Sequence, residues 1–345
     1  MKIEHREKLK VSTKSVHAAT IEIWDNHPVF SWFGGTREGS QDTCIYLHNL
    51  KNKQETITIG FDDVIPRWNP ILVNIGSDLL LFEKAGFFCD RWQTFIHNVS
   101  KWDEGITKKE IYQNRKVLPA GLNGPVKSRP LIKGNRMYCG SSFETLYDWS
   151  SYIEEYIIEG SDIIFDVRSN PIIEPIKKTY SNHRSGRTET SLGLIQPTLC
   201  ELNGYMFALM RSSGGLERIY YVSRQMGLDW EYWDSAIKTN LPNPNSAVDV
   251  VSYDGSIYLI WNPDERNRFP LVLSKIKMKN LLKSELEFEI EDSILISDEL
   301  NDQNFIEKGC ISPELSYPYM VENDGNLHIV YTRGRNSIEY CIVKL

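Results

Sequence analysis

The sequence predicts an all-β fold, a six-bladed β-propeller of four-stranded antiparallel blades, with residues 1–345 forming a single domain. Two observations predict this fold. Short runs rich in β-branched and aromatic residues follow one another along the chain, separated by turn signals such as NG, DG and GG, whereas helical periodicity is scarce. In addition, a pattern of one polar residue, a proline and then apolar residues recurs, which indicates an internal repeat.

The repeat has four clear copies and two looser ones. Propeller blades have roughly 40–50 residues before insertions, and the copies here lie 50 to 71 residues apart. Proline is tolerated at the start of an inner strand, because its missing N–H is not needed there. The leading residues of the six copies are His17, Asn69, Arg129, Gln196, Ser246 and Tyr317.

The repeat divides the chain into consecutive blades. The first contains strands at residues 18–24 and 29–33, then a glycine-rich charged loop and a strand at 43–48. The last blade has too few strands, so we expect residues 3–9 to supply its fourth and to close the ring. The expected blades are residues 11–61, 62–119, 120–188, 189–240, 241–305 and 306–345.

Two long loops interrupt the repeat. Residues 171–192 carry His183, Arg184 and Arg187, and we expect this loop to close over the mouth of the propeller and to favour action at a chain end. Residues 279–307 are acidic, and we expect them to be partly helical.

Composition restricts the partners of the protein. The net charge of −7 argues against nucleic acid or an anionic membrane. The chain as given has no signal-peptide or transmembrane segment, so we expect it to be cytoplasmic, or secreted if a signal has been trimmed. The 6 cysteines lie far apart and no Cys/His or His/Asp cluster has the spacing of a metal site, so we expect neither a metal nor a cofactor.

The geometry of a propeller brings distant residues together. The innermost strand of each blade begins at one face and the second strand returns to it, so the leading residues converge on the channel mouth. The ends of the second strands add Arg37, Arg211 and Arg333, and an arginine-rich mouth favours a small anionic ligand. The alternative is that these arginines pair between blades with Glu38, Glu217 or Asp264.

Five motifs follow one another along the chain: WFGGTREGSQD, LIQPTL, LPNPNS, SYP and DGNLHIVYT. Together they resemble the sialidase superfamily, and more closely its branch of predicted neuraminidases with BNR (Asp-box) repeats. This resemblance implies a six-bladed propeller and a site for an acidic oligosaccharide or glycoconjugate at the mouth. One Asp-box keeps only Ser223, Gly227 and Trp230 of its skeleton.

The resemblance also implies roles for single residues. Asp42 matches the acid/base aspartate, and Tyr317 matches the tyrosine nucleophile, with Leu315 as the alternative for that position. The arginines implied in binding the sugar carboxylate are Arg37, Arg211 and Arg268.

Two positions depart from the pattern of the superfamily. His17 stands where the first carboxylate-binding arginine is expected. Gln196 stands where a glutamate normally activates the tyrosine, and an amide cannot take a proton from a phenol. The usual pair of tyrosine and glutamate is therefore not assembled from these residues.

Three functions follow from these observations. The first is an exo-glycosidase on a terminal acidic sugar, with Asp42 as proton donor and Tyr317 as nucleophile or cation stabiliser. The second is a polysaccharide lyase on uronic-acid glycans, with His17 and Tyr317 as the acid/base pair and the carboxylate neutralised by Arg129, Asn69 and Gln196. The third is a glycan-binding propeller or protein-interaction scaffold without catalysis.

Overall fold

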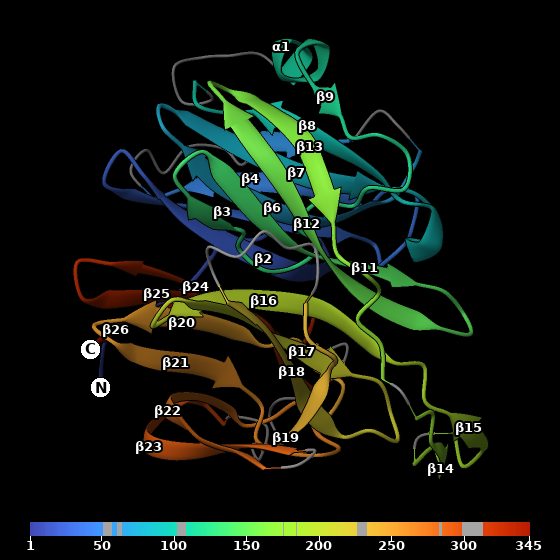
Figure 1. Cartoon of the computed structure of the whole chain (residues 1–345). Helices are drawn as coiled ribbons and strands as arrows, with labels where there is room; N and C mark the ends of the chain where they lie inside the picture. Colours follow the sequence, from blue (N-terminus) through green and yellow to red (C-terminus); the bar gives the residue numbers. More distant parts are fainter. Residues whose placement is uncertain are drawn as a thin grey trace.

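The computed structural model describes residues 1–50, 57–60, 64–101, 108–174, 176–183, 185–225, 233–282, 285–298 and 313–345. Strands dominate its regular structure, and the described helical segments are α1 (Lys108–Gln113) and the 3-10 turn η1 (Cys89–Arg91) (Figure 1). The prediction of an all-β protein is therefore confirmed. None of the helices described is long and apolar enough to cross a membrane.

Four of the sheets are antiparallel and have four strands each. In three of them the strands pair in sequence order, and in the fourth the first strand of the chain joins the last three. They consist of β2 (Ser15–Trp24), β3 (His27–Gly35), β4 (Cys44–Asn49) and β5 (Ile57–Ile59); β6 (Arg67–Ile75), β7 (Asp78–Ala85), β8 (Gln93–Asn98) and β9 (Lys116–Val117); β10 (Leu131–Lys133), β11 (Arg136–Glu144), β12 (Trp149–Glu159) and β13 (Asp162–Arg168); and β24 (Leu315–Asn323), β25 (Asn326–Arg333), β26 (Ser337–Lys344) and β1 (Lys2–Lys8).

A larger sheet joins the fourth and fifth predicted blades. It has eight strands, because the outer strands of two meanders form a short parallel pair in which Lys238 lies opposite Glu285. The two meanders therefore share one sheet instead of forming two separate ones. They consist of β16 (Leu194–Leu202), β17 (Tyr205–Ser212), β18 (Arg218–Gln225) and β19 (Ile237–Pro242), and of β20 (Asp249–Tyr253), β21 (Ser256–Trp261), β22 (Leu271–Leu282) and β23 (Glu285–Ser297).

Both long loops contain strands. The first carries a small hairpin of β14 (Thr179–Ser181) and β15 (Thr188–Thr190). The expectation of helix in the second is wrong for β23, where acidic residues at the start of the strand alternate with the buried Leu286 and Phe288. That period of two is typical of a strand with one exposed face. Outside the described residues lie positions 283–284 and 299–307 of this loop, together with Arg184, Gly227 and Trp230.

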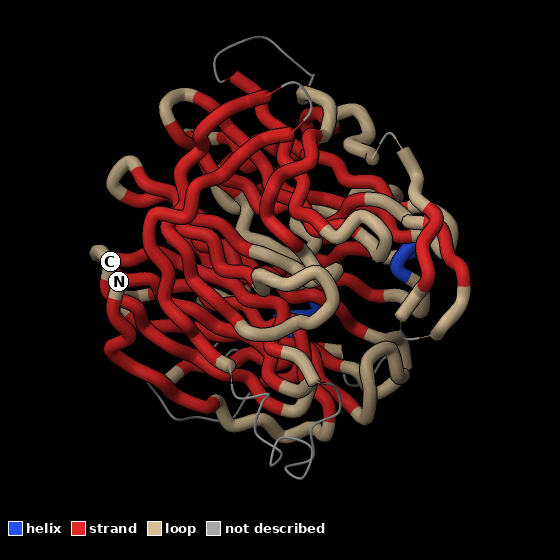
Figure 2. The backbone as a smooth tube through the Cα atoms, turned by 90° about the horizontal axis from the view of Figure 1, so that it is seen from below, coloured by secondary structure: helices blue, strands red, loops and turns tan. Residues whose placement is uncertain are grey.

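The innermost strands lie around a common centre. β24 contacts both β2 and β20, while β2 also contacts β6 and β20 also contacts β16. The expected fourth strand of the last sheet is confirmed, because β1 pairs with β26 from Lys2 opposite Lys344 to Lys8 opposite Glu339. The two ends of the chain therefore lie side by side (Figures 1 and 2).

A β-bulge recurs in four of the innermost strands. At each bulge the pairing with the second strand shifts by one residue, and one non-glycine residue has a left-handed backbone conformation. The polar–proline repeat therefore marks a bulge and not the start of a strand, and a proline fits there because a bulge interrupts the ladder. The residues with positive φ are Ala18 (51°), Asn69 (36°), Gln196 (57°) and Tyr317 (52°). His17 thus precedes the equivalent position by one residue.

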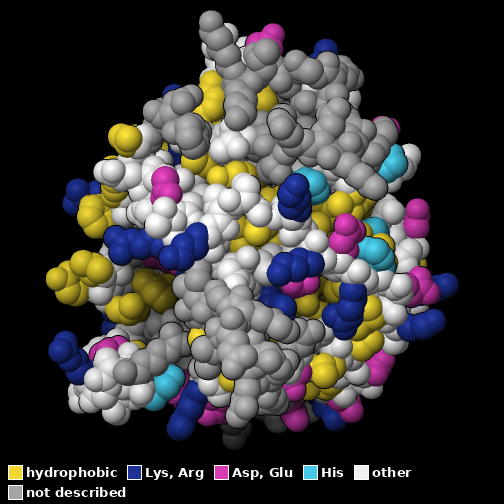
Figure 3. Space-filling model, turned by 180° about the vertical axis from the view of Figure 1, so that it is seen from behind, with side chains coloured by type: hydrophobic (Ala, Val, Ile, Leu, Met, Phe, Trp, Pro, Cys, Tyr) yellow, Lys and Arg dark blue, Asp and Glu magenta, His cyan; other side chains and the backbone are white. Residues whose placement is uncertain are grey.

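The surface seen from behind carries both signs of charge. Basic and acidic side chains are both spread over the face shown in Figure 3. The described part of that face therefore does not form the continuous basic surface that nucleic-acid binding needs.

Lys84 is a buried cation on β7, facing the third sheet. Its side chain is 0% exposed, and Nζ donates a hydrogen bond to the carbonyl oxygen of Pro125. Burial lowers the pKa of Lys84 to about 7, although Cys139, Glu154 and Glu83 act to raise it. A lysine in an unfolded chain has a pKa near 10.4. Between these values the unfolded chain binds more protons here than the folded chain does, so stability rises with pH.

We expect Lys84 to contribute a rise in the free energy of unfolding above pH 7 of up to about 1.4 kcal/mol per pH unit. Lys84→Met keeps a similar volume and removes this contribution. Urea unfolding at several pH values between 6.5 and 9.5 should therefore show the native protein gaining stability relative to Lys84→Met as the pH rises. The exposed Lys10→Met is the control, and a stability difference that does not vary with pH would contradict the prediction.

Candidate functional site

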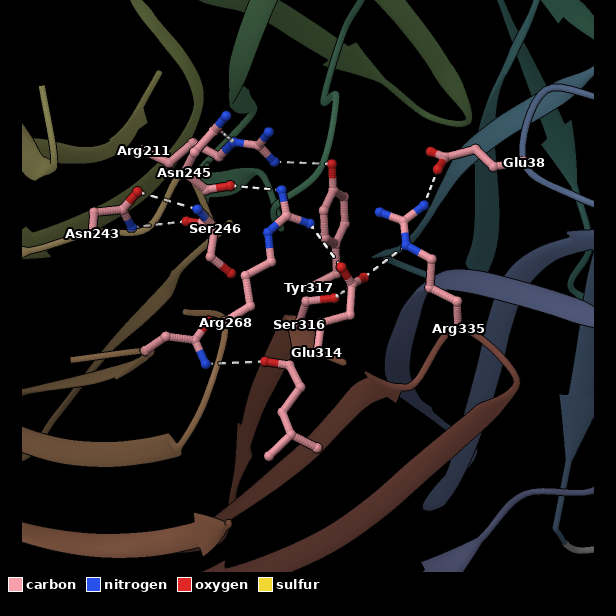
Figure 4. A network of polar contacts seen from close by, with 12 residues as sticks. Glu38, Arg211, Asn243, Asn245, Ser246, Arg268, Glu314, Ser316, Tyr317 and Arg335 are labelled. Atoms are coloured by element: carbon pink, nitrogen blue, oxygen red, sulfur yellow. Dashed lines mark hydrogen bonds and ion pairs between the residues drawn. The ribbon is translucent and has the colours of Figure 1, made fainter. Parts of the chain in front are cut away.

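Arg211, near the end of β17, holds the hydroxyl group of Tyr317. Its Nη1 donates to Tyr317 Oη and its Nε donates to Asn245 Oδ1, both at 3.0 Å (Figure 4). Nη1 also donates to Gln196 Oε1 at 3.0 Å. Gln196 Nε2 donates to the same phenol oxygen at 3.1 Å. Two donors from neighbouring strands therefore fix this oxygen, and both contacts leave the phenol proton free to be transferred.

Two further guanidinium groups lie beside the Tyr317 ring, on either side of Glu314 (Figure 4). Arg268 Nη1 lies 3.2 Å from Glu314 Oε2 and its Nη2 donates to the carbonyl oxygen of Asn245 at 2.8 Å. Arg335 Nε donates to Glu314 Oε1 at 2.8 Å. Glu314 immediately precedes β24, so one carboxylate places two arginines next to the bulge that carries Tyr317.

The charge of Glu314 is stabilised by its surroundings. Burial acts to raise the pKa of this carboxyl group, but Arg268, Arg335 and the hydrogen bond from Ser316 lower it, and the net shift is downward. Glu314 is therefore ionised at neutral pH. It offsets part of the positive charge of the arginines.

Glu38 closes the network from the opposite side of the mouth. It lies on the loop between β3 and β4, and its carboxylate pairs with Arg335 Nη1 (Figure 4). The predicted alternative paired Glu38 with Arg37, Arg211 or Arg333, whereas its partner here is Arg335. Glu38 and Glu314 therefore hold the Arg335 guanidinium group from two sides.

Asp42 lies on the same loop but is engaged within it. Its Oδ2 accepts hydrogen bonds from the backbone N (2.9 Å) and Oγ1 (2.6 Å) of Thr36, and its Oδ1 accepts one from Ser40 Oγ. The hydrogen bonds from Ser40 and Thr36 lower the pKa of Asp42. A proton donor at neutral pH needs a raised pKa, so this arrangement favours a structural role for Asp42. Arg37 is exposed on this loop.

His17 packs beneath Tyr317. The two ring centroids are 4.2 Å apart, and Phe33 contacts the imidazole edge-on at 5.7 Å. His17 is 1% exposed, and its two ring nitrogens have no hydrogen-bond partner in the described part of the chain. Burial lowers the pKa of His17 well below its ordinary value, and the surrounding arginines and Lys127 lower it further. It is therefore a neutral ring that supports Tyr317.

Lys127 fills the centre of the ring below the site. Its Nζ donates to the carbonyl oxygen of Pro318, in the bulge next to Tyr317, and to that of Val248 at 3.2 Å. Burial lowers its pKa to about 8, although Asp249 acts to raise it. Asp249 in turn accepts hydrogen bonds from Thr198 Oγ1 (2.6 Å) and from the backbone N of Met320 (2.8 Å). These contacts tie the inner strands together beneath the arginines.

Three predicted residues lie outside this network. Arg129 is 3.7 Å from Glu22 and lines a pocket with the distal ends of β16, β20 and β24, at the opposite end of the ring from Tyr317. The structure does not place Arg129 at the mouth as expected. Arg129 lacks the left-handed bulge conformation that Asn69, Gln196 and Tyr317 share. Arg333 lies 4.0 Å from Glu339 on the neighbouring strand. Asn69 is buried in the bulge of β6.

The sequence interpretation missed most partners of the arginines. Among them are Glu314, which directly precedes β24, and Asn245, which lies a few residues before β20. Glu144, at the end of β11, also interacts with Arg211 and Gln196: burial raises its pKa, while Arg211, Ser142 and Gln196 oppose the rise. The sequence signal that these residues share is a position at or near the end of a strand. No group of three or more His, Cys, Asp or Glu side chains suited to a metal occurs among the residues described.

Comparisons with known proteins agree with this architecture. A Dyadobacter fermentans protein of unknown function superposes with a TM-score of 0.68 at 10% identity, covering 100% of this chain and 99% of its own. The Penicillium chrysogenum α-L-arabinanase complexed with arabinobiose gives 0.54 at 12% identity, covering 96% of this chain and 93% of its own.

The Trypanosoma rangeli sialidase in complex with the inhibitor DANA gives a TM-score of 0.59 at 12% identity. It covers 96% of this chain, which spans 55% of the sialidase. A search of curated protein sequences finds no match. The family model described as a BNR repeat-like domain matches residues 27–329. The predicted resemblance to proteins with BNR repeats is confirmed, and the chain belongs to the family of BNR repeat-like domains.

Proposed function

We propose that this protein is an exo-glycosidase that acts on a terminal acidic sugar. The observation that carries the proposal is the convergence of Arg211, Arg268 and Arg335 on Tyr317 from three different connections of the fold. Each guanidinium group is held by protein contacts, so their arrangement is fixed before a ligand binds. Planar guanidinium groups bind carboxylates through paired hydrogen bonds. In this proposal Arg335 replaces Arg37 as the third arginine.

Tyr317 is the nucleophile in this proposal. Its Oη forms a bond to the anomeric carbon as the bond from that carbon to the leaving oxygen breaks, and the leaving oxygen takes a proton from solvent. Water then bonds to the anomeric carbon and frees the sugar, and the proton that this water loses returns to Tyr317 Oη. The phenol proton needs an acceptor, and Gln196 does not provide one. Glu144 is the carboxyl group beside Gln196 and Arg211, and the rise in its pKa caused by burial makes its carboxylate a stronger base for this proton.

The known folds of the comparison proteins support a carbohydrate-active propeller in general terms. The sialidase structure holds the inhibitor DANA and the arabinanase structure holds arabinobiose. We also propose that the eight-stranded sheet counts as two blades, which would give six in total. The lyase alternative is weakened, since its proposed acid/base His17 is buried and neutral and Arg129 lies at the opposite end of the ring.

The test is an incubation with sialylated and uronate-containing glycans. Released sugar is followed by mass, and unsaturated uronate by ultraviolet absorbance. We expect an intact acidic sugar without a new ultraviolet band, and we expect Glu144→Gln to lose turnover while it still binds ligand. A rising ultraviolet band would indicate a lyase instead. Binding without turnover would indicate a glycan-binding protein, and the absence of both would contradict the proposal.

A further inference from the structure

The two meanders of the eight-stranded sheet enclose a large cavity. Their outer strands β19 and β23 form the parallel pair, and the two edge strands of the sheet, β16 and β20, also contact each other. The sheet therefore curves back on itself almost as a closed barrel. We call the space between its two meanders the barrel cavity, which has a volume of about 780 Å³ and is lined by residues of both meanders.

The barrel cavity lies far from the arginine site. Tyr205 lines it at the start of β17, whereas Arg211, which holds Tyr317, lies six residues further along the same strand. A strand rises roughly 3.3 Å per residue, so these two positions are about 20 Å apart. None of the arginines around Tyr317 lines the cavity. A molecule in the barrel cavity would therefore be a second ligand, separate from the acidic sugar.

The walls of the barrel cavity are mainly apolar and rigid. Phe207 and Tyr221 line it from one meander as a stacked pair with ring centroids 5.7 Å apart, and Ile257 and Ile276 line it from the other. All four side chains are buried, and they lie on paired strands of the sheet. Tyr205 is 48% exposed, so the cavity reaches the surface beside this ring. The cavity is therefore formed before a ligand binds.

The charged residues in the described lining balance one another. They are two acids, Asp234 and Glu291, and two bases, Lys275 and Lys277. Lys275 lies 3.6 Å from Glu291, and Asp234 accepts a hydrogen bond from Ser223 Oγ at 2.8 Å. A charged ligand would lose its hydration here without meeting an excess of opposite charge, which is costly. A neutral ligand with an apolar body avoids this cost and gains contact with the rings.

We propose that the barrel cavity binds a neutral, largely apolar small molecule of two or three rings. Its rings pack against the aromatic wall, and a polar group of the ligand lies at the opening near Ser223 and Asp234. The volume falls within the roughly 300–1,000 Å³ of small-molecule sites, which combine apolar walls with a few polar groups and often occupy the mouths of barrels. This inference does not depend on the proposed function, because the two sites share no residue of the arginine network.

The test measures binding of prodan, a neutral naphthalene ketone whose fluorescence shifts to the blue in an apolar site. The native protein should bind prodan saturably. Neutral naphthamide should then displace prodan at a concentration about tenfold lower than naphthoate or naphthylmethylammonium, which have the same rings but carry a charge. Equal displacement by all three would overturn the assignment of a neutral ligand, and the absence of saturable binding would overturn the site.

Two variants locate the probe. Met278→Trp fills the cavity from a side chain of its wall that is 37% exposed, and Tyr205→Ala removes the exposed ring. Each should weaken prodan binding by about tenfold, so one gives the answer if the other folds poorly. The matched controls Leu146→Trp and Tyr147→Ala change exposed residues outside the cavity and should bind prodan as the native protein does. Native affinity in a folded Met278→Trp or Tyr205→Ala variant, or an equal loss in the controls, would overturn the inference.

Discussion

Replacing Arg211 with lysine should weaken binding of an acidic sugar by on the order of a hundredfold. The lysine ammonium group cannot reproduce the planar set of contacts that Arg211 makes with Tyr317, Gln196 and Asn245. These acceptors are buried or nearly so, and a buried polar group that loses its partner costs about 1–3 kcal/mol. Binding of the sugar also loses one of its charged donors.

Calorimetric titration of the Arg211→Lys variant with an acidic monosaccharide measures this loss. Arg37→Lys is the informative comparison, because Arg37 is exposed on its loop and we expect its affinity to change by less than about threefold. Arg335→Lys should resemble Arg211→Lys. If Arg37→Lys lost as much affinity as Arg211→Lys, the result would assign Arg37, and not Arg335, to the ligand site.

Replacing Gly140 with alanine should destabilise the protein by about 3 kcal/mol or more. Gly140 lies in the middle of β11, directly against the carbonyl oxygen of Pro197, and a Cβ at this position would overlap that oxygen. Neither strand moves away without breaking its own pairing, and overpacking of this kind typically costs 1–3 kcal/mol, occasionally more. Because Pro197 follows Gln196 in the bulge, the shift should also disturb the contact with Tyr317.

Urea unfolding measures this effect, with Gly160→Ala as the matched control. Gly160 lies in a turn with φ of 64°, and nothing surrounds the position of its Cβ. Its substitution therefore costs only the strain of a left-handed alanine, about 1–2 kcal/mol. A loss at Gly140 no larger than at Gly160 would show that β11 and the bulge of β16 adjust easily to one another, contrary to this prediction.

The repeat itself could be predicted because it has a local cause. Each bulge needs a residue that accepts the left-handed conformation next to one that can lack an N–H, and the polar–proline pair satisfies both in Asn69, Gln196 and Tyr317. The copy at His17 was misaligned by one residue, since it has two alanines at the bulge and nothing in the local pattern marks them. The closing strand β1 was also predictable, because the last predicted blade had too few strands and needed a fourth.

The contacts between sheets could not be predicted in the same way. The pairing of Glu38 with Arg335 joins residues 297 positions apart, and no local pattern distinguishes Arg335 from Arg37 or Arg333. The parallel contact of β19 with β23 similarly depends on how two meanders meet in space. Local physics determines strands and bulges, whereas the choice of partner for a loop side chain depends on the assembled ring.

The pairing of β1 with β26 bears on how the protein is made. The ribosome delivers β1 long before its partner β26, so β1 must wait with an unpaired edge. Closure of the ring is therefore a late, long-range event, and such contacts fold slowly because the loop entropy is lost before the pairing forms. Because β1 and β26 are paired, the two ends of the given chain lie next to each other. A circular permutant, in which these ends are joined and the chain is opened at an exposed turn, should therefore keep the native fold.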